Sequence, residues 1–120
     1  MNSDSLLQQY NISIPTEASN FQAYTEDGID HAVWVYFDLP VTKTEAFILN
    51  NHLTEHLNPE FRAMRNFHLR TQAWWTPDAY ENFRSGSLQQ ESVKPFYGLS
   101  FLIGEKNEQT NAVFLFVTSL

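Results

Sequence analysis

Two histidines spaced four residues apart form the part of this sequence that most resembles a catalytic signature. His52 and His56 enclose the stretch HLTEH, in which Glu55 directly precedes the second histidine. In inverzincin peptidases this pattern supplies two zinc ligands and a glutamate that acts as general base. On a helix, residues four apart lie about 40° from each other around the axis, so the two histidines could share a metal.

Other observations argue against a zinc enzyme. A catalytic zinc needs a third protein ligand, and no later acidic residue has a helical context that places it beside the histidines. A chain of 120 residues is also too short for the substrate chamber of such peptidases. We therefore expect HLTEH to be the solvated flank of a helix, with an adventitious or structural metal at His52 and His56 as the alternative.

The sequence contains no other recognisable catalytic set. It has no cysteine, which excludes disulfides, thiolate zinc sites and cysteine nucleophiles. Its four glycines stand singly, so there is no phosphate-binding loop or dinucleotide fingerprint. His31 has Asp30 and Asp38 nearby in the sequence for acid-base work, but nothing pairs it with a nucleophile. These absences predict a protein that is not an enzyme and has no cofactor.

Two groups of residues are candidates for binding. Residues 61–70 gather Arg62, Arg65 and Arg70, and guanidinium groups suit carboxylate or phosphate ligands. The alternative for these arginines is a polar strand face that pairs with acidic residues. The candidates for a protein interface are the aromatic residues Trp74 and Tyr80 and three acids of one turn, which are Glu26, Asp27 and Asp30.

The negative charge of the chain is concentrated in its first half. The net charge is -7; residues 1–60 carry nine acids against Lys43 alone, whereas residues 61–120 carry five acids and six bases. Such a chain repels nucleic-acid phosphates, so DNA or RNA binding is not expected. It attracts a basic protein surface instead, although an acidic surface also serves solubility alone.

Alternation and turn residues predict the strands. Residues 31–39 (HAVWVYFDL) are apolar on both faces, which indicates a strand inside the sheet. Residues 95–104 and 112–120 predict a hairpin whose last strand is central. We also expect an edge strand at Ile12–Ile14, a strand over 67–75, a short helix from Pro77 to Phe83, and a polar loop over 85–92.

The best-signalled helix is predicted over residues 43–57. Thr42 and Glu45 have the spacing of a capping box, and Asn58-Pro59 would end the helix. A wheel places Ala46, Leu49, Leu53 and Leu57 toward the sheet. The predicted fold class is α+β: a single domain spanning 1–120, with a mainly antiparallel sheet of four to five strands, this helix on one face and a second short helix.

One stretch carries a resemblance. The run IPTEASNFQAY, followed by DGIDHAVWVYFDLP and TEAF (14–47), resembles the opening of small, uncharacterised bacterial proteins, many of them described as lipoproteins. The resemblance implies a bacterial origin and export, and nothing about activity. The first ten residues have no signal-peptide pattern, so we expect a cytoplasmic protein by default, or a periplasmic one if an export signal has been removed.

These observations favour a small acidic binding protein without enzymatic activity. An immunity or inhibitor protein that neutralises a basic protein partner fits them, with no nucleic acid and no membrane span involved. The alternative is a small-ligand or envelope-associated domain that uses the arginines of residues 61–70. The sequence does not indicate an oligomeric state.

Overall fold

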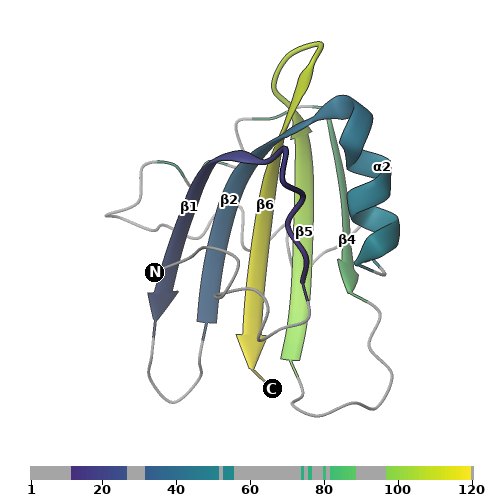
Figure 1. The fold of residues 1–120 in the computed structure, drawn as a ribbon. Coiled ribbons are helices and arrows are strands. Elements are labelled where there is room, and N and C mark those ends of the chain that lie inside the picture. Colours follow the sequence, from purple (N-terminus) through teal and green to yellow (C-terminus); the bar gives the residue numbers. More distant parts are fainter. Residues whose placement is uncertain are drawn as a thin grey trace.

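One antiparallel sheet with a helix against one of its faces forms most of the structure (Figure 1). The computed structural model describes residues 12–26, 32–51, 53–55, 74, 76, 80, 82–88 and 97–119. In chain order the elements are β1 (Ser19–Glu26), β2 (Ala32–Pro40), α2 (Val41–Asn50), β3 (Leu53–Glu55), β4 (Phe83–Leu88), β5 (Tyr97–Glu105) and β6 (Thr110–Ser119). Across the sheet the order is β1-β2-β6-β5-β4-β3.

This architecture confirms the predicted α+β class. Five of the strands have at least six residues, and β3 adds a strand of three residues at one edge. The predicted hairpin of the last two strands is present, and β6 lies between β2 and β5 as expected for a strand that is apolar on both faces. Within the described residues no helix has the length and apolarity needed to cross a membrane.

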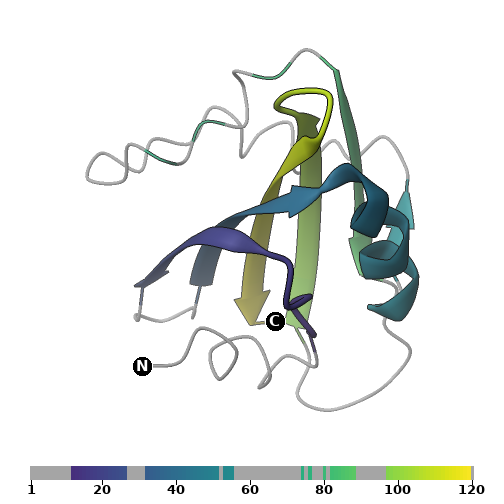
Figure 2. The ribbon, with the colours of Figure 1, turned by 45° about the horizontal axis from the view of Figure 1, so that its top comes forward.

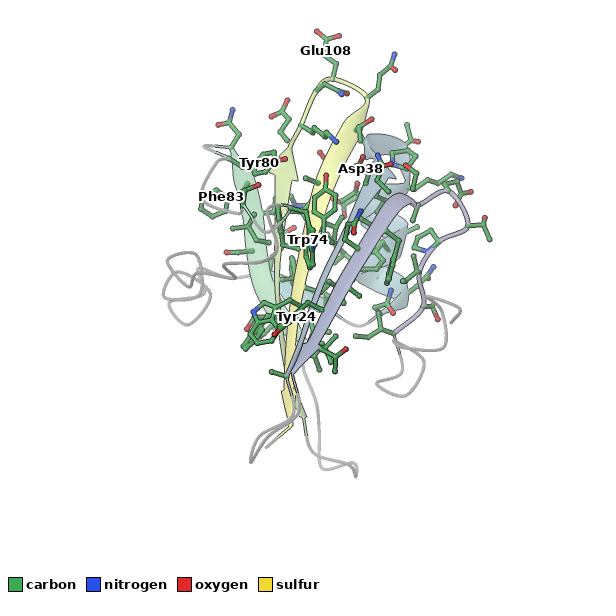
Figure 3. The ribbon with its side chains drawn as sticks, turned by 90° about the vertical axis from the view of Figure 1, so that its left-hand side faces the viewer. Tyr24, Asp38, Trp74, Tyr80, Phe83 and Glu108 are labelled. Carbon is green, nitrogen blue, oxygen red and sulfur yellow. The ribbon has the colours of Figure 1, made fainter. Side chains whose placement is uncertain are left out.

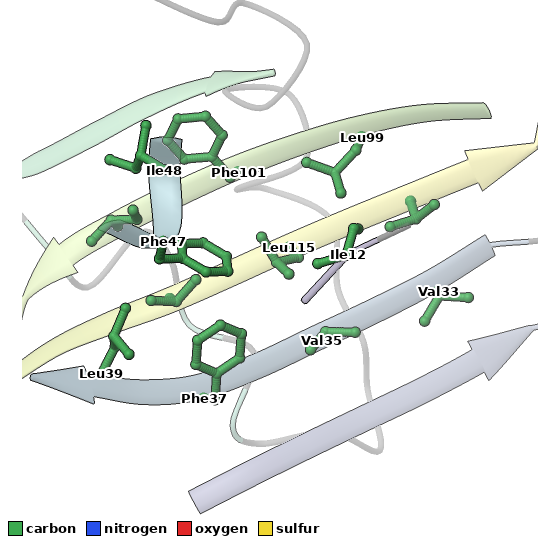
Figure 4. Packing of buried hydrophobic residues seen from close by; sticks show 13 residues of the cluster. Ile12, Val33, Val35, Phe37, Leu39, Phe47, Ile48, Leu99, Phe101 and Leu115 are labelled. Atoms are coloured by element: carbon green, nitrogen blue, oxygen red, sulfur yellow. The ribbon is translucent and has the colours of Figure 1, made fainter. Parts of the chain in front are cut away.

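The sheet buries apolar side chains on both faces. The helix-covered face holds the larger cluster, where Phe37 of β2 and Phe101 of β5 are fully buried beneath α2 (Figures 2 and 4). We call the opposite side the aromatic face. It contains Trp34, Tyr36, Leu102, Ala112 and Phe114, with Tyr24, Ala32, Trp74, Tyr80 and Phe116 packed against them. Period-two alternation along β2 and β6 divides the residues between these two clusters.

Helix α2 is shorter than predicted and rotated relative to the predicted wheel. It begins directly after Pro40 and ends at Asn50, so the prediction of a helix over residues 43–57 is wrong at its C-terminal end. The buried residues are Thr44, Phe47 and Ile48, whereas Ala46 is exposed and Leu49 is 71% exposed. Phe47 and Ile48 offer more apolar area than Ala46 and Leu49, and this burial decides which side faces the sheet.

Several smaller expectations are also corrected. Ile12–Ile14 is not a strand; Ile12 instead enters the core as part of an irregular segment. Strand β1 was not expected, because its residues have no clear alternation. Strand β4 occupies Phe83–Leu88, where a helix end and a polar loop were predicted. Of the predicted strand 67–75 and the short helix, most residues lie outside the described part, and Trp74 lies in a turn.

Candidate functional site

A buried carboxylate lies at the end of β2, on the aromatic face. Strand alternation places Trp34, Tyr36 and Asp38 on the same side of the strand. Asp38 is only 5% exposed, although its neighbours on this face are largely aromatic. A buried charge of this kind requires hydrogen-bonding partners, because an unpaired ion in the interior costs several kcal/mol.

Three side chains supply these partners. The Tyr36 hydroxyl donates to Oδ1 of Asp38, and the Asn20 amide donates to Oδ2 at 2.6 Å. Nζ of Lys106 lies 3.2 Å from Oδ1 and 3.0 Å from Oδ2. We call these four residues the Asp38 cluster. It joins β1, β2 and the connection between β5 and β6, which are far apart in the sequence.

The cluster changes the acidity of two of its members. Burial alone raises the pKa of Asp38, but the hydrogen bonds from Tyr36, Asn20 and Lys106 outweigh it and leave this pKa below its ordinary value of 3.8. Burial and the hydrogen bond to Asp38 raise the pKa of the Tyr36 hydroxyl well above its ordinary value of 10.0. At neutral pH the carboxyl is therefore ionised and the phenol is protonated.

Asn20 reaches Asp38 from an unusual backbone position. Its φ is 55°, in the left-handed region, and the pairing of β1 with β2 shifts register between Ser19 and Gln22. Asparagine tolerates this region better than most residues because its short polar side chain can hydrogen-bond locally. The irregularity in β1 thus directs an amide donor at the buried carboxylate.

The β5–β6 turn (residues 106–109) is fixed from several sides. Lys106 holds it to Asp38 on the aromatic face. On the helix-covered face, the backbone N–H of Val41 donates to Gln109 O at 2.9 Å, and Nδ2 of Asn111 donates to Oγ1 of Thr44 at 2.9 Å. Within the turn, Oδ1 of Asn107 accepts from the N–H groups of Gln109 and Thr110, each at 2.9 Å.

Two exposed acids, Glu105 and Glu108, flank or lie within this fixed turn. The backbone N–H of Glu105 donates to Asn82 O at 3.0 Å, which ties the end of β5 to the residue before β4. Figure 3 shows Glu108 at the tip of the turn, beyond the end of the sheet. The backbone that carries both carboxylates is therefore positioned in advance of any binding event.

A groove lies beside the turn, between the start of α2 and the start of β4. Its volume is about 510 Å³, and its lining residues are Val41, Asn82, Phe83, Arg84, Ile103, Glu105, Glu108 and Asn111. Of its three apolar residues, Val41 is 40% exposed, Phe83 is 37% exposed and Ile103 is buried. Arg84 reaches Glu45 of α2, so strand alternation turns the Phe83 side chain toward the aromatic face. The groove thus combines the exposed surface of Val41 with the two acids of the turn.

The charge of Arg84 is already engaged. Its Nη1 lies 2.6 Å from Oε1 of Glu45 on α2, and its Nε and Nη2 contact Oε1 of Glu55 on β3. Burial lowers the pKa of Arg84, but the hydrogen bonds and charges of both glutamates outweigh it and raise this pKa overall. Among the residues that the structure describes, Arg84 therefore pairs with Glu45 and Glu55, and no ion pair joins it to Glu105 or Glu108.

No protein-family model matches this chain, and no curated protein or solved structure is significantly similar to it.

Two of the predicted interface residues lie together on the aromatic face. Trp74 and Tyr80 both pack against its cluster, and the Tyr80 ring lies 5.7 Å from that of Phe114 (Figure 3). Glu26 ends β1 opposite Ala32, at the other end of β2 from Asp38. Trp74 and Tyr80 are thus only partly exposed, and Glu26 belongs to a different part of the molecule from the β5–β6 turn.

The remaining predicted site residues lie outside the described part of the chain: His52, His56, Asp27, Asp30, Arg62, Arg65 and Arg70. The helical geometry assumed for HLTEH is nevertheless wrong, because α2 ends at Asn50 and Leu53–Glu55 forms strand β3. Among the residues that are described, no group of three or more His, Asp or Glu side chains is placed to hold a metal ion.

Sequence reasoning missed Lys106, Glu105 and Glu108 as site residues. One signal was present: Asp38 is the sole charged residue in the otherwise apolar stretch 32–40 (AVWVYFDLP), so it needed a partner. Its partner Lys106 lies 68 residues away, in the turn of the predicted hairpin. Only the pairing of β2 with β6 brings the two together.

Proposed function

We propose that this protein is a non-enzymatic binding protein that recognises a basic protein partner through the β5–β6 turn. The observation that carries the proposal is the fixation of this turn. Lys106, Gln109 and Asn111 tie it to β2 and α2, while Glu105 and Glu108 remain exposed. A turn whose backbone is already fixed loses little backbone entropy on binding, which favours affinity and specificity.

The electrostatics of the molecule support the same partner chemistry. The chain has a net charge of -7. The groove beside the turn is lined by two acids, Glu105 and Glu108, and by Arg84, whose charge is already paired with two other glutamates. A negative surface of this kind speeds association with a basic surface and disfavours acidic partners. An inhibitor or immunity protein that neutralises a basic enzyme or toxin is the role that fits best.

The chemistry of the Asp38 cluster supports a structural role for its carboxylate. Both oxygens of Asp38 already accept hydrogen bonds, and its lowered pKa makes it a poor proton acceptor. The raised pKa of Tyr36 keeps this hydroxyl protonated. Neither group has the properties of a general base at neutral pH, which is why we place the function in binding.

The proposal is tested by capture from the cell that produces the protein. The immobilised chain should retain a basic protein that then binds the purified chain with one-to-one stoichiometry in calorimetry. The variant Glu105→Gln, Glu108→Gln should retain much less of it, whereas the control Glu17→Gln, Glu26→Gln removes the same charge elsewhere and should retain it. Recovery of no stoichiometric partner, or of an acidic one, would refute the proposal.

A further inference from the structure

Strand β1 forms one edge of the sheet, and its outer side has no neighbouring strand among the described residues (Figure 1). On its inner side it pairs with β2, whereas no hydrogen bond leads from its outer side to another described residue. Most of its described side chains are exposed, which are those of Ser19, Asn20, Gln22, Ala23 and Thr25. The backbone N–H and C=O groups along this edge are therefore open to pairing with another strand.

The two edges of the sheet differ in how they are protected. At the opposite edge, β3 has three residues and carries Glu55, which Arg84 binds. A short edge strand with charged side chains resists pairing with another chain. Strand β1 has eight residues and no charged side chain from Ser19 to Thr25. The register shift between Ser19 and Gln22 protects only the start of β1, because its pairing with β2 is regular from Gln22 onward.

The lack of charge along β1 favours a second copy of this chain as the occupant of the edge. A basic segment of another protein would gain no electrostatic attraction from these neutral side chains. Two copies of a chain with a net charge of -7 repel each other where their acids face one another. At β1 the two copies can approach without facing acids. Helix α2 lies toward the opposite edge of the sheet, so it does not stand between the two strands (Figure 1).

Antiparallel geometry restricts how β1 can pair with itself. Along an antiparallel strand, successive residues turn their backbone groups to opposite sides and their side chains to opposite faces. Opposing residues of two identical strands must therefore be both odd-numbered or both even-numbered, which places the two-fold axis on a residue. The regular part of β1 runs from Gln22 to the end of the strand, and the residue at its centre is Tyr24.

We propose that the protein forms a symmetric dimer in which β1 pairs antiparallel with β1 of a second copy, centred on Tyr24. The two Tyr24 side chains then lie beside each other on the aromatic face, and Ala23 opposes Thr25 of the second copy on the helix-covered face. Aromatic side chains that face each other across two strands stabilise the pairing. The sheets of both copies become one continuous sheet, and this dimer does not depend on the proposed basic partner.

The test is analytical ultracentrifugation of the full chain between about 1 µM and about 1 mM, together with hydrogen exchange at both concentrations. The chain should change from monomer to dimer over this range, and amides of β1 should exchange more slowly in the dimer. Added salt should strengthen the dimer, because it screens the repulsion between two acidic copies. A chain that stays monomeric at about 1 mM, or a dimer in which exchange slows elsewhere than at β1, would overturn the inference.

Two double variants test the register through the exposed residues Ala23 and Thr25. In Ala23→Lys, Thr25→Lys the introduced lysines oppose each other across the two-fold axis, whereas in Ala23→Lys, Thr25→Glu each lysine opposes a glutamate. The dissociation constant of the dimer should rise roughly fivefold for the first variant and stay level or fall for the second.

General repulsion between the copies predicts the opposite order, because the variant with lysine at both positions has the smaller net negative charge. Urea unfolding of dilute samples should show that both variants fold as monomers, since the two side chains are exposed. Equal dissociation constants for the two variants would show that β1 is not paired in this register, and the inference would be wrong.

The outcomes distinguish this inference from the proposed function. If a basic partner is captured and the free chain stays monomeric, the proposed function stands and the dimer is wrong. If the complex with that partner slows exchange at β1 while the free chain stays monomeric, β1 receives a strand of the partner and the dimer is again wrong. If the chain dimerises through β1 and no basic partner exists, only the proposed function fails.

Discussion

At the scale of single residues, Asp38 should make the protein sensitive to acid. Replacing it with asparagine removes the charge that three donors surround, and we expect a loss of about 2 kcal/mol in the free energy of unfolding near pH 7. The pKa of Asp38 is lower in the folded state than its ordinary value of 3.8, which applies to the unfolded chain. The extra stability that the carboxylate gives the wild type is therefore complete above pH 3.8, and it disappears as the pH falls through the folded-state pKa.

Urea unfolding followed by tryptophan fluorescence, from about pH 7 down to about pH 2, measures both effects. The wild type and Asp38→Asn should differ most at neutral pH and converge in acid. As a comparison, Glu108→Gln removes an exposed acid and should change stability by less than about 0.5 kcal/mol. A constant difference between wild type and Asp38→Asn at all pH values would show that the carboxylate charge does not stabilise the fold.

Asn20 combines a backbone role and a side-chain role, and two substitutions separate them. Asn20→Gly and Asn20→Ala both lose the hydrogen bond to Asp38, but only alanine opposes the φ of 55°. We expect a loss of about 1 kcal/mol for glycine and about 2 kcal/mol for alanine in thermal or urea unfolding. Equal losses would mean that β1 relaxes out of the left-handed conformation once the amide is gone.

At the scale of elements, Asn51 joins the end of α2 to the segment before β1. Its side chain accepts from the backbone N–H of Ser13 at 2.7 Å and donates to the carbonyls of Ser13 and Phe47. Asn51 is 3% exposed, and alanine would remove its hydrogen bonds to both backbone groups of Ser13 and leave a space where the amide was packed, so we expect a loss of about 2–3 kcal/mol. The adjacent, exposed Asn50 is the matched control, and Asn50→Ala should cost less than about 0.5 kcal/mol.

Asn51 also explains why the end of the helix could not be predicted. The sequence offers an obvious stop at Asn58-Pro59, and a propensity argument has no reason to end the helix at residue 50. In the structure the Asn51 side chain makes hydrogen bonds over 38 residues to Ser13, and β3 then pairs with β4. Tertiary hydrogen bonds of this range override local helix signals, and they are invisible to periodicity.

The contact between β5 and Tyr80 gives a second test at this scale. A Cβ added at Gly104 would lie 2.5 Å from Cγ of Tyr80, so Gly104→Ala forces the ring to move. We expect a loss of about 1–3 kcal/mol, and a smaller loss when the same change is made in a Tyr80→Ala background. Unfolding of the two single variants and the double variant measures the coupling. Additive losses would place Tyr80 away from Gly104.

At the scale of the whole molecule, the sheet was more predictable than the site. Strands β2, β5 and β6 have long runs of apolar residues in the sequence, so their positions could be predicted from the hydrophobic pattern alone. The central place of β6 follows from the apolar residues on both of its faces. The site depends on which residues the register brings together. Pro40 pairs with Thr110 and Leu39 with Asn111, which places the β5–β6 turn beside the start of α2. No local pattern encodes that register.

The distribution of charge over the whole molecule predicts how the proposed association responds to salt. The rate of association with the basic partner should fall as salt rises, because the screening length shortens from about 10 Å at 0.1 M to about 3 Å at 1 M. Stopped-flow measurements should give a lower rate for Glu105→Gln, Glu108→Gln than for wild type at low salt, with the two rates converging at high salt. The control Glu17→Gln, Glu26→Gln loses the same total charge. If it slows association less than Glu105→Gln, Glu108→Gln does, the electrostatic attraction of the partner is centred on the β5–β6 turn. An association rate that does not respond to salt would exclude electrostatic recognition of a basic surface.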